Sequence, residues 1–223
     1  MELLKVTYDV VGLFSLKQFG QGHLNNRSYD IPMNSTIRGA LLGMMIKQHG
    51  LTFAMDNYET LRSLYLFVQA PKHSWHNQLV LNRITNRGFS EQGKITQFDD
   101  VDKYRTVGIR GMVHVEQIVF YIEDNLEGLR EYLHSIQTLG DSESQVGLRS
   151  IEPVKVMEDV LVPFVDTTDL DKPLHEMWDW KPNKPFDKSY GYSTNRLNGN
   201  VRTLCYTEQH IEAEEAIKKW NSL

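Results

Sequence analysis

The chain has 223 residues, of which 40% are hydrophobic and 24% charged, as in ordinary globular proteins. Its net charge of −5 disfavours a generic nucleic-acid-binding protein, whose surface is usually basic. The single cysteine, Cys205, excludes an internal disulfide and a thiolate zinc cluster. The N-terminus lacks the pattern of a secretory signal, and the longest apolar runs, such as 160–165, are too short to span a bilayer. We therefore expect a cytoplasmic protein with no membrane partner.

The first elements are predicted to be a strand, a loop and a helix. Residues 3–16 alternate and are rich in β-branched and aromatic side chains, which predicts a long strand bent at Gly12. Residues 18–32 are polar and predict a loop. Residues 35–48 carry apolar side chains at helical spacing and are followed by a stop at Gly50.

Four further elements complete a strand, helix, strand, strand, helix, strand order. This order is that of a ferredoxin-like, RNA-recognition-like (RRM-like) α+β domain. The elements are strands at 64–69, 113–123 and 146–156 and a helix at 127–138. We expect this domain to occupy residues 1–157.

A connection of unusual length, residues 71–112, separates the second and third strands of this frame. Residues 62–114 contain eight Lys and Arg and four Asp and Glu, whereas residues 115–223 contain eleven Lys and Arg and twenty Asp and Glu. Basic and aromatic side chains are interleaved in the insertion: Lys72, His73, His76, Arg83, Arg87, Lys94, Lys103, Arg105 and Arg110, with Trp75, Phe89, Phe98 and Tyr104. Single-stranded RNA needs both kinds, because phosphates attract cations and unstacked bases need flat faces. The alternative is a folded-back hairpin that covers the sheet as a lid.

The remainder, residues 158–223, is predicted to be a small extension of strands and loops. Its expected elements are a strand at 160–165, a loop at 166–189, a hairpin at 196–207 and a helix at 211–220.

The segment 26–43 is the most informative part of the chain. A polar loop ends in a proline, and either Asn34 or Ser35 can cap the helix that follows. Free backbone N–H groups and the helix dipole favour an anion at such a helix start, and both Arg27 and Arg38 could reach it. The alternative is an ordinary connection with solvated arginines.

Two stretches of the sequence resemble CRISPR-associated protein five. The first is the Ser-Tyr-x-x-Pro loop of residues 28–32, which leads into a helix with Ser35, Thr36 and Gly39. The second is the Leu-Gly-x-Ser-Glu turn of residues 139–143, which follows the second helix in that family. With the element order, the resemblance covers about residues 3–156. The family is the RAMP-superfamily subunit of Cascade-type complexes that holds the 5′ handle of the guide RNA (crRNA).

The resemblance implies a β-hairpin thumb at 71–112, a reduced C-terminal portion and a non-catalytic role in antiviral defence without a cofactor. The implied partners are the crRNA 5′ handle, the neighbouring Cascade backbone subunit, the large subunit and, indirectly, target DNA. The expected RNA-binding residues are Asn25, Arg27, Ser28, Tyr29, Asn34, Ser35, Arg38, Lys72, Arg83, Arg87, Arg105, Arg110, Ser142 and Arg149.

Two other functions stay open at this point. One subtype of the family processes precursor crRNA without metal, using a tyrosine with a lysine–histidine pair, and Tyr29, Lys72 and His73 are residues of these types. A metal-independent endoribonuclease is therefore the alternative, and a plain RRM-like module without a CRISPR role is a third. We expect no metal site, because His73 and His76 lack a third ligand and the acidic run 99–102 suits a solvated turn.

Overall fold

A four-stranded antiparallel sheet in the order β2-β5-β1-β6 forms the centre of the chain. Its strands are β1 (Leu3–Val10), β2 (Leu66–Val68), β5 (Gln117–Glu123) and β6 (Val146–Val154). This order confirms the predicted ferredoxin-like frame, because the first strand lies between the third and fourth strands of the motif. The computed structural model describes residues 3–16, 27–84, 105–140, 144–164, 172–181, 186 and 200–223.

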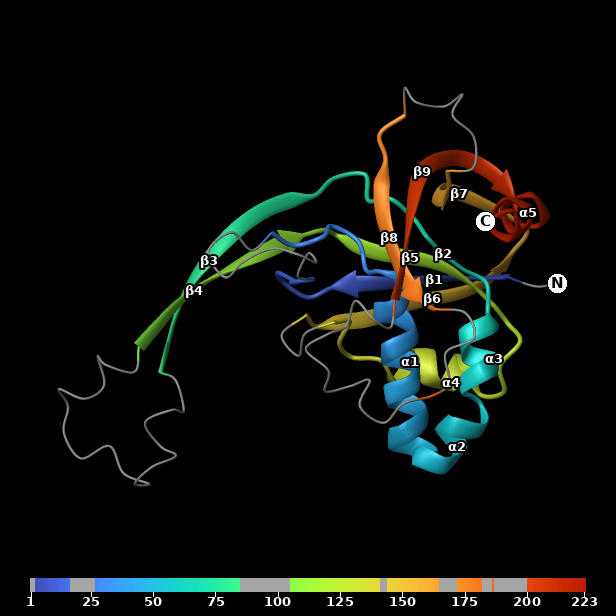
Figure 1. Cartoon of the computed structure of the whole chain (residues 1–223), viewed down its shortest axis with the longest axis horizontal. Coiled ribbons are helices and arrows are strands. Elements are labelled where there is room, and N and C mark those ends of the chain that lie inside the picture. The colour runs from blue at the N-terminus through green and yellow to red at the C-terminus, as the bar shows by residue number, and fades with distance from the viewer. Residues whose placement is uncertain are drawn as a thin grey trace.

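Four helices cover one face of this sheet (Figure 1). They are α1 (Asn34–His49), α2 (Leu51–Asp56), α3 (Tyr58–Ser63) and α4 (Leu129–Ser135). The main core lies beneath them, where Val6 and Tyr8 of β1 belong to the same buried cluster as Ile37 and Leu41 of α1. Each such side chain contributes about 1.5–3 kcal/mol through removal from water.

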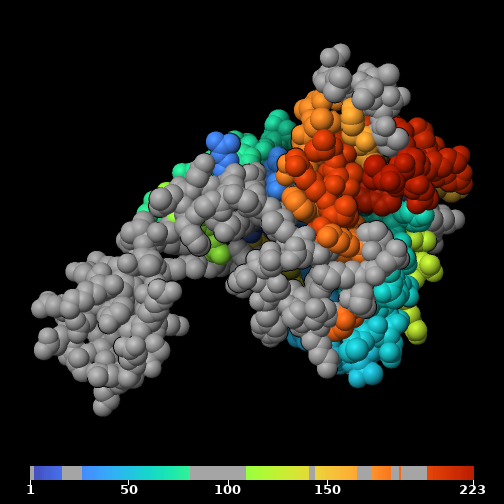
Figure 2. All heavy atoms as spheres, in the orientation of Figure 1, coloured from blue at the N-terminus to red at the C-terminus, as the bar shows by residue number. Residues whose placement is uncertain are grey.

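The C-terminal elements form a second, three-stranded sheet in the order β7-β9-β8. They are β7 (Val156–Pro163), β8 (His175–Trp180), β9 (Asn200–Glu212) and the helix α5 (Ala213–Asn221). Figure 2 shows them, in orange and red, gathered on one side of the body. A second core forms where Leu3, Phe67 and Tyr121 of the central sheet pack with residues of β7, β9 and α5. Part of the sheet face opposite the helices is therefore occupied by protein.

β3 (Trp75–Ile84) and β4 (Arg105–His114) form a two-stranded antiparallel hairpin, paired from Trp75 with His114 to Ile84 with Arg105. Both strands extend away from the central sheet (Figure 1). The expected β-hairpin is thus present, and the lid alternative is wrong for these two strands. The chain between them, 85–104, lies outside the described residues.

The predicted strands 3–16 and 113–123 are each divided in the structure. β1 ends at Val10, because Gly12 adopts a φ of +89°, a left-handed conformation that glycine tolerates and that ends the ladder. Phe14 then pairs with Val113 at the base of the hairpin. β4 accordingly runs to His114, and β5 begins only at Gln117.

Other differences come from short elements with weak periodic signals. The helices α2 and α3 each have six residues and were not predicted. β8 lies within the predicted loop 166–189, so the loop prediction is wrong there, and β9 pairs with β8 along its start. The Asn198-Gly199 turn of the hairpin predicted at 196–207 lies outside the described residues. α4 is shorter than 127–138 at both ends: it starts after Gly128, at a φ of +76°, and it ends before Ile136, whose backbone is extended. The terminal helix α5 is confirmed, whereas the domain boundary at 157 stays a prediction.

Candidate nucleic-acid interface

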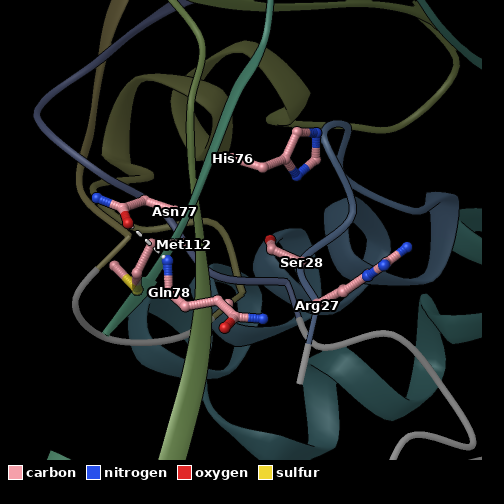
Figure 3. Close-up of a pocket in the computed structure, with 7 residues that line it drawn as sticks. Arg27, Ser28, His76, Asn77, Gln78 and Met112 are labelled. Atoms are coloured by element: carbon pink, nitrogen blue, oxygen red, sulfur yellow. Dashed lines mark hydrogen bonds between the residues drawn. The ribbon is translucent and has the colours of Figure 1, made fainter. Parts of the chain in front are cut away.

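A pocket of about 590 Å³ lies between the loop that precedes α1 and the base of the hairpin. Seven residues line it: Arg27, Ser28, His76, Asn77, Gln78, Gly111 and Met112. In Figure 3, His76 and Gln78 extend from β3 on the side where Ser28 and Arg27 lie. Neither an aspartate nor a glutamate is among these residues, so the lining suits an anionic or polar ligand.

Residues 14–16 tie the two walls of this pocket together. The Leu16 N–H donates to Ser28 Oγ at 2.8 Å, and the Tyr29 N–H donates to the Leu16 carbonyl at 2.8 Å. On the other side, Ser15 Oγ donates to the Gly111 carbonyl at 2.8 Å. Both walls are thus hydrogen-bonded to one short segment, which fixes the loop against the base of the hairpin.

The arms of the hairpin, residues 71–84 and 105–114, are cationic. They contain Lys72, Arg83, Arg105, Arg110 and three histidines, and no aspartate or glutamate. All four acids of the insertion lie in 85–104. A surface of this kind attracts phosphates, even on a chain whose net charge is negative.

The start of α1 is closed off, so the predicted anion site at this helix terminus is wrong. Asn34 is 1% exposed, and its backbone N–H points to the sulfur of Met177 on β8, at 3.3 Å. Met33, with no side-chain hydrogen bond, occupies the N-cap position that was predicted for Asn34 or Ser35. The Asn34 side-chain amide instead donates to the Leu66 carbonyl at 3.0 Å. Strand β8 fills the space that an anion would need.

Arg38 is also buried, with 4% of its surface exposed, and this contradicts its predicted role in RNA binding. Its guanidinium donates to both carboxylate oxygens of Asp179, at 2.8 and 3.2 Å. It donates as well to the carbonyls of Leu61, at 2.5 Å, and Leu64, at 2.8 Å. Four of its five N–H bonds are engaged in this way, so the side chain joins α1 to β8 and to the end of α3.

Tyr29 is directed towards the C-terminal sheet. Its hydroxyl donates to Glu176 Oε2 at 3.3 Å and accepts a hydrogen bond from Trp178 Nε1 at 3.2 Å. Both partners belong to β8. Lys72 and His73, the other two residues of the endoribonuclease alternative, lie exposed just before β3.

The remaining predicted residues lie at several places. Ser35 is half-buried in the first turn of α1, and Arg110 is half-buried on β4. Arg149 lies on β6 and pairs with Asp9, with 3.0 Å between Nε and Oδ1. The backbone of Arg83 and Arg105 is in the hairpin strands. Asn25, Arg87 and Ser142 are outside the described residues.

The pocket residues Asn77, Gln78, Gly111 and Met112 were not predicted as site residues. Ser15 and Leu16 connect these residues to the loop that holds Arg27, through hydrogen bonds to Gly111 and to Ser28. A polar pair inside a strand carries no signal for such a contact.

The described residues offer few groups for covalent or metal chemistry. Burial raises the pKa of the Cys205 thiol to about 12, so it stays protonated and unreactive at neutral pH. Across the described ranges, no three metal-ligating side chains come together. Within the same ranges, no helix combines the length and the apolar character that crossing a membrane requires.

No protein-family model matches the sequence, and no curated protein matches it either. Among solved structures, the chain is similar to a CRISPR protein from Archaeoglobus fulgidus, with a TM-score of 0.50 and 16% identity over 94% of this chain and 87% of that one. A chain of the type III-B Cmr-beta complex bound to cognate target RNA has a TM-score of 0.46 and 16% identity, over 69% of this chain and 60% of that one. A chain of the type III-A Csm3–Csm4 subcomplex has a TM-score of 0.39 and 9% identity, over 95% of this chain and 93% of that one. The chain therefore shares the fold of the Archaeoglobus fulgidus CRISPR protein.

Proposed function

We propose that this chain is a non-catalytic RNA-binding subunit of a CRISPR effector complex and belongs to the RAMP superfamily. It holds the 5′ handle of the crRNA at one end of the complex, next to a backbone subunit and the large subunit, and it works in the cytoplasm. The observation that carries the proposal is the hairpin whose arms are cationic and free of carboxylates, and whose base forms a pocket with Arg27. The fold shared with a CRISPR protein supports it.

The pocket suits single-stranded RNA on physical grounds. Recognition of an unstacked nucleotide needs a cation for the phosphate and polar groups for the edge of the base. Arg27 supplies the cation, and His76, Asn77 and Gln78 supply donors and acceptors. A plain RRM-like module is less well supported, because such a module reads RNA on its open sheet face. Here Leu3, Phe67 and Tyr121 of that face are buried under the C-terminal elements.

The first test removes the cation of the pocket. Arg27→Ala should weaken binding of a single-stranded repeat RNA by about 1–3 kcal/mol, because it removes a charge-assisted contact. Fluorescence anisotropy with labelled RNA measures the effect. Lys47→Ala is the matched control, since Lys47 is exposed in the last turn of α1, at the opposite end of the helix from the loop. Equal affinity of Arg27→Ala and wild type would place the RNA elsewhere.

The second test concerns catalysis. Cleavage of an RNA without metal needs a base, an acid and a cation around one phosphate, whereas the Tyr29 hydroxyl contacts Glu176 and Trp178 on β8. We expect the purified protein to leave a repeat RNA intact in the presence of a chelator, as followed on a denaturing gel. Cleavage that is lost in His73→Ala would establish the endoribonuclease instead.

A further inference from the structure

The hairpin exposes a large aromatic side chain at its base, on the strand face opposite the pocket residues His76 and Gln78. Trp75 is 60% exposed, although it lies in a strand beside the body of the protein. Successive residues of a strand point to opposite faces, so Trp75, Asn77 and Leu79 share one face and His76 and Gln78 the other. His114 and Arg110, which pair with Trp75 and Leu79, lie on the Trp75 face as well.

Two imidazoles flank the Trp75 ring. The ring centre of His73 is 6.1 Å away and tilted by 39°, and that of His114 is 5.7 Å away and tilted by 38°. His114 is itself anchored, with Nδ1 3.1 Å from the Gly12 carbonyl. The indole therefore has two imidazoles as neighbours, while more than half of its surface remains open to solvent.

From this arrangement we infer that Trp75 is a stacking platform for one unpaired nucleobase of single-stranded RNA. The inference rests on the proposed function and adds a second contact to it, on the strand face opposite the pocket residues His76 and Gln78. A base stacks on an aromatic ring whatever its sequence, and the phosphates on either side need nearby cations.

The positive charge around Trp75 favours RNA, rather than a protein, as the ligand of this face. The arms around Trp75 carry Lys72 and Arg110 with several histidines and lack any carboxylate. Arg110 is on the same face, and the exposed apolar area there is interrupted by the polar Asn77. Phosphates complement the positive charge of this surface, whereas an apolar protein patch does not.

The experiment compares two synthetic oligonucleotides of about twelve residues, one a natural single-stranded RNA and one in which the central positions are abasic. Both carry the same phosphates, and only the first carries bases to stack. Wild-type protein should bind the natural RNA about 5- to 150-fold more tightly than the abasic one, and Trp75→Ala should lose most of this preference. Trp75→Phe should keep part of it. The natural RNA should also quench tryptophan fluorescence in wild type and less so in Trp75→Phe.

Val80→Ala is the matched control, because Val80 is 61% exposed on the same strand but on the opposite face. It should behave as wild type with both oligonucleotides. If wild type prefers the natural RNA and Trp75→Ala keeps that preference, the platform is refuted while the proposed function stands. If Trp75→Ala fails to join the effector yet binds RNA as wild type does, the occupant is a protein. Failure of wild type to bind either oligonucleotide would overturn the proposed function itself.

Discussion

Replacing residues 80–109 with an Asn-Gly turn should give a folded protein that fails to join the effector complex. Leu79 and Arg110 face each other across the hairpin, so a two-residue turn can connect them without changing the register below. The change removes five cations of the insertion: Arg83, Arg87, Lys94, Lys103 and Arg105. Affinity for single-stranded RNA should fall by roughly tenfold. A plot of the logarithm of the binding constant against the logarithm of the salt concentration should become less steep, by about 0.7 for each phosphate that these cations no longer neutralise.

Removing the whole insertion, 71–112, should have a different result. Met112 is 7% exposed and Gly111 accepts the hydrogen bond from Ser15, so this cut enters the core. It should cost about 2–5 kcal/mol of stability, as the loss of a large buried side chain does. Thermal unfolding followed by circular dichroism separates the two variants. A cooperative melt like that of wild type after the full deletion would show that the base of the hairpin contributes little to the core.

Asp179→Ala should destabilise the protein by about 3–5 kcal/mol, a large part of the stability of an ordinary domain. The change leaves the buried Arg38 guanidinium without the carboxylate that accepts two of its hydrogen bonds. Asp179 is also buried, at 8% exposure, so bulk water does not readily take its place. Denaturant unfolding measures the loss as a lower midpoint with an unchanged slope.

The Asp179→Ala variant also shows whether the role of Arg38 is structural or is to bind RNA. Under conditions where Asp179→Ala remains folded, its affinity for single-stranded RNA should equal that of wild type. Asp179→Asn serves as the control, because it keeps the shape and one acceptor oxygen and should cost less than Asp179→Ala. A weaker affinity for RNA at unchanged stability would restore Arg38 to the binding site.

The frame of the fold could be predicted from the sequence because its strands and α1 are long and periodic. Residues 35–48 carry helical spacing up to Gly50, and α1 ends at His49 with Gly50 at a φ of +87°. This frame depends on local pattern and on chain connectivity, which a sequence contains. The β-hairpin was expected from the resemblance to CRISPR-associated protein five, at a long insertion between two strands that can pair directly, and β2 and β5 do pair.

The location of the site could be predicted only in part, and one missed strand explains the main error. Residues 175–180 have too many polar and bulky side chains in succession to show alternation, so the sequence does not indicate β8 there. Because β8 packs on the start of α1, Asp179 accepts hydrogen bonds from Arg38, and Met177 contacts the backbone N–H of Asn34. Arg27, which precedes that contact, stays on the surface and lines the pocket.

The outer strand β6 has a consequence for self-association. Strands at the edge of a sheet recruit strands of other chains through unused backbone groups, which leads to aggregates or to endless polymers. β6 resists this with Pro153, which has no N–H to donate, with a register shift opposite Thr7 and Tyr8, and with the exposed charges of Arg149 and Glu152. A protein proposed to occupy one end of an assembly needs this resistance, since its stoichiometry must stop at a single copy.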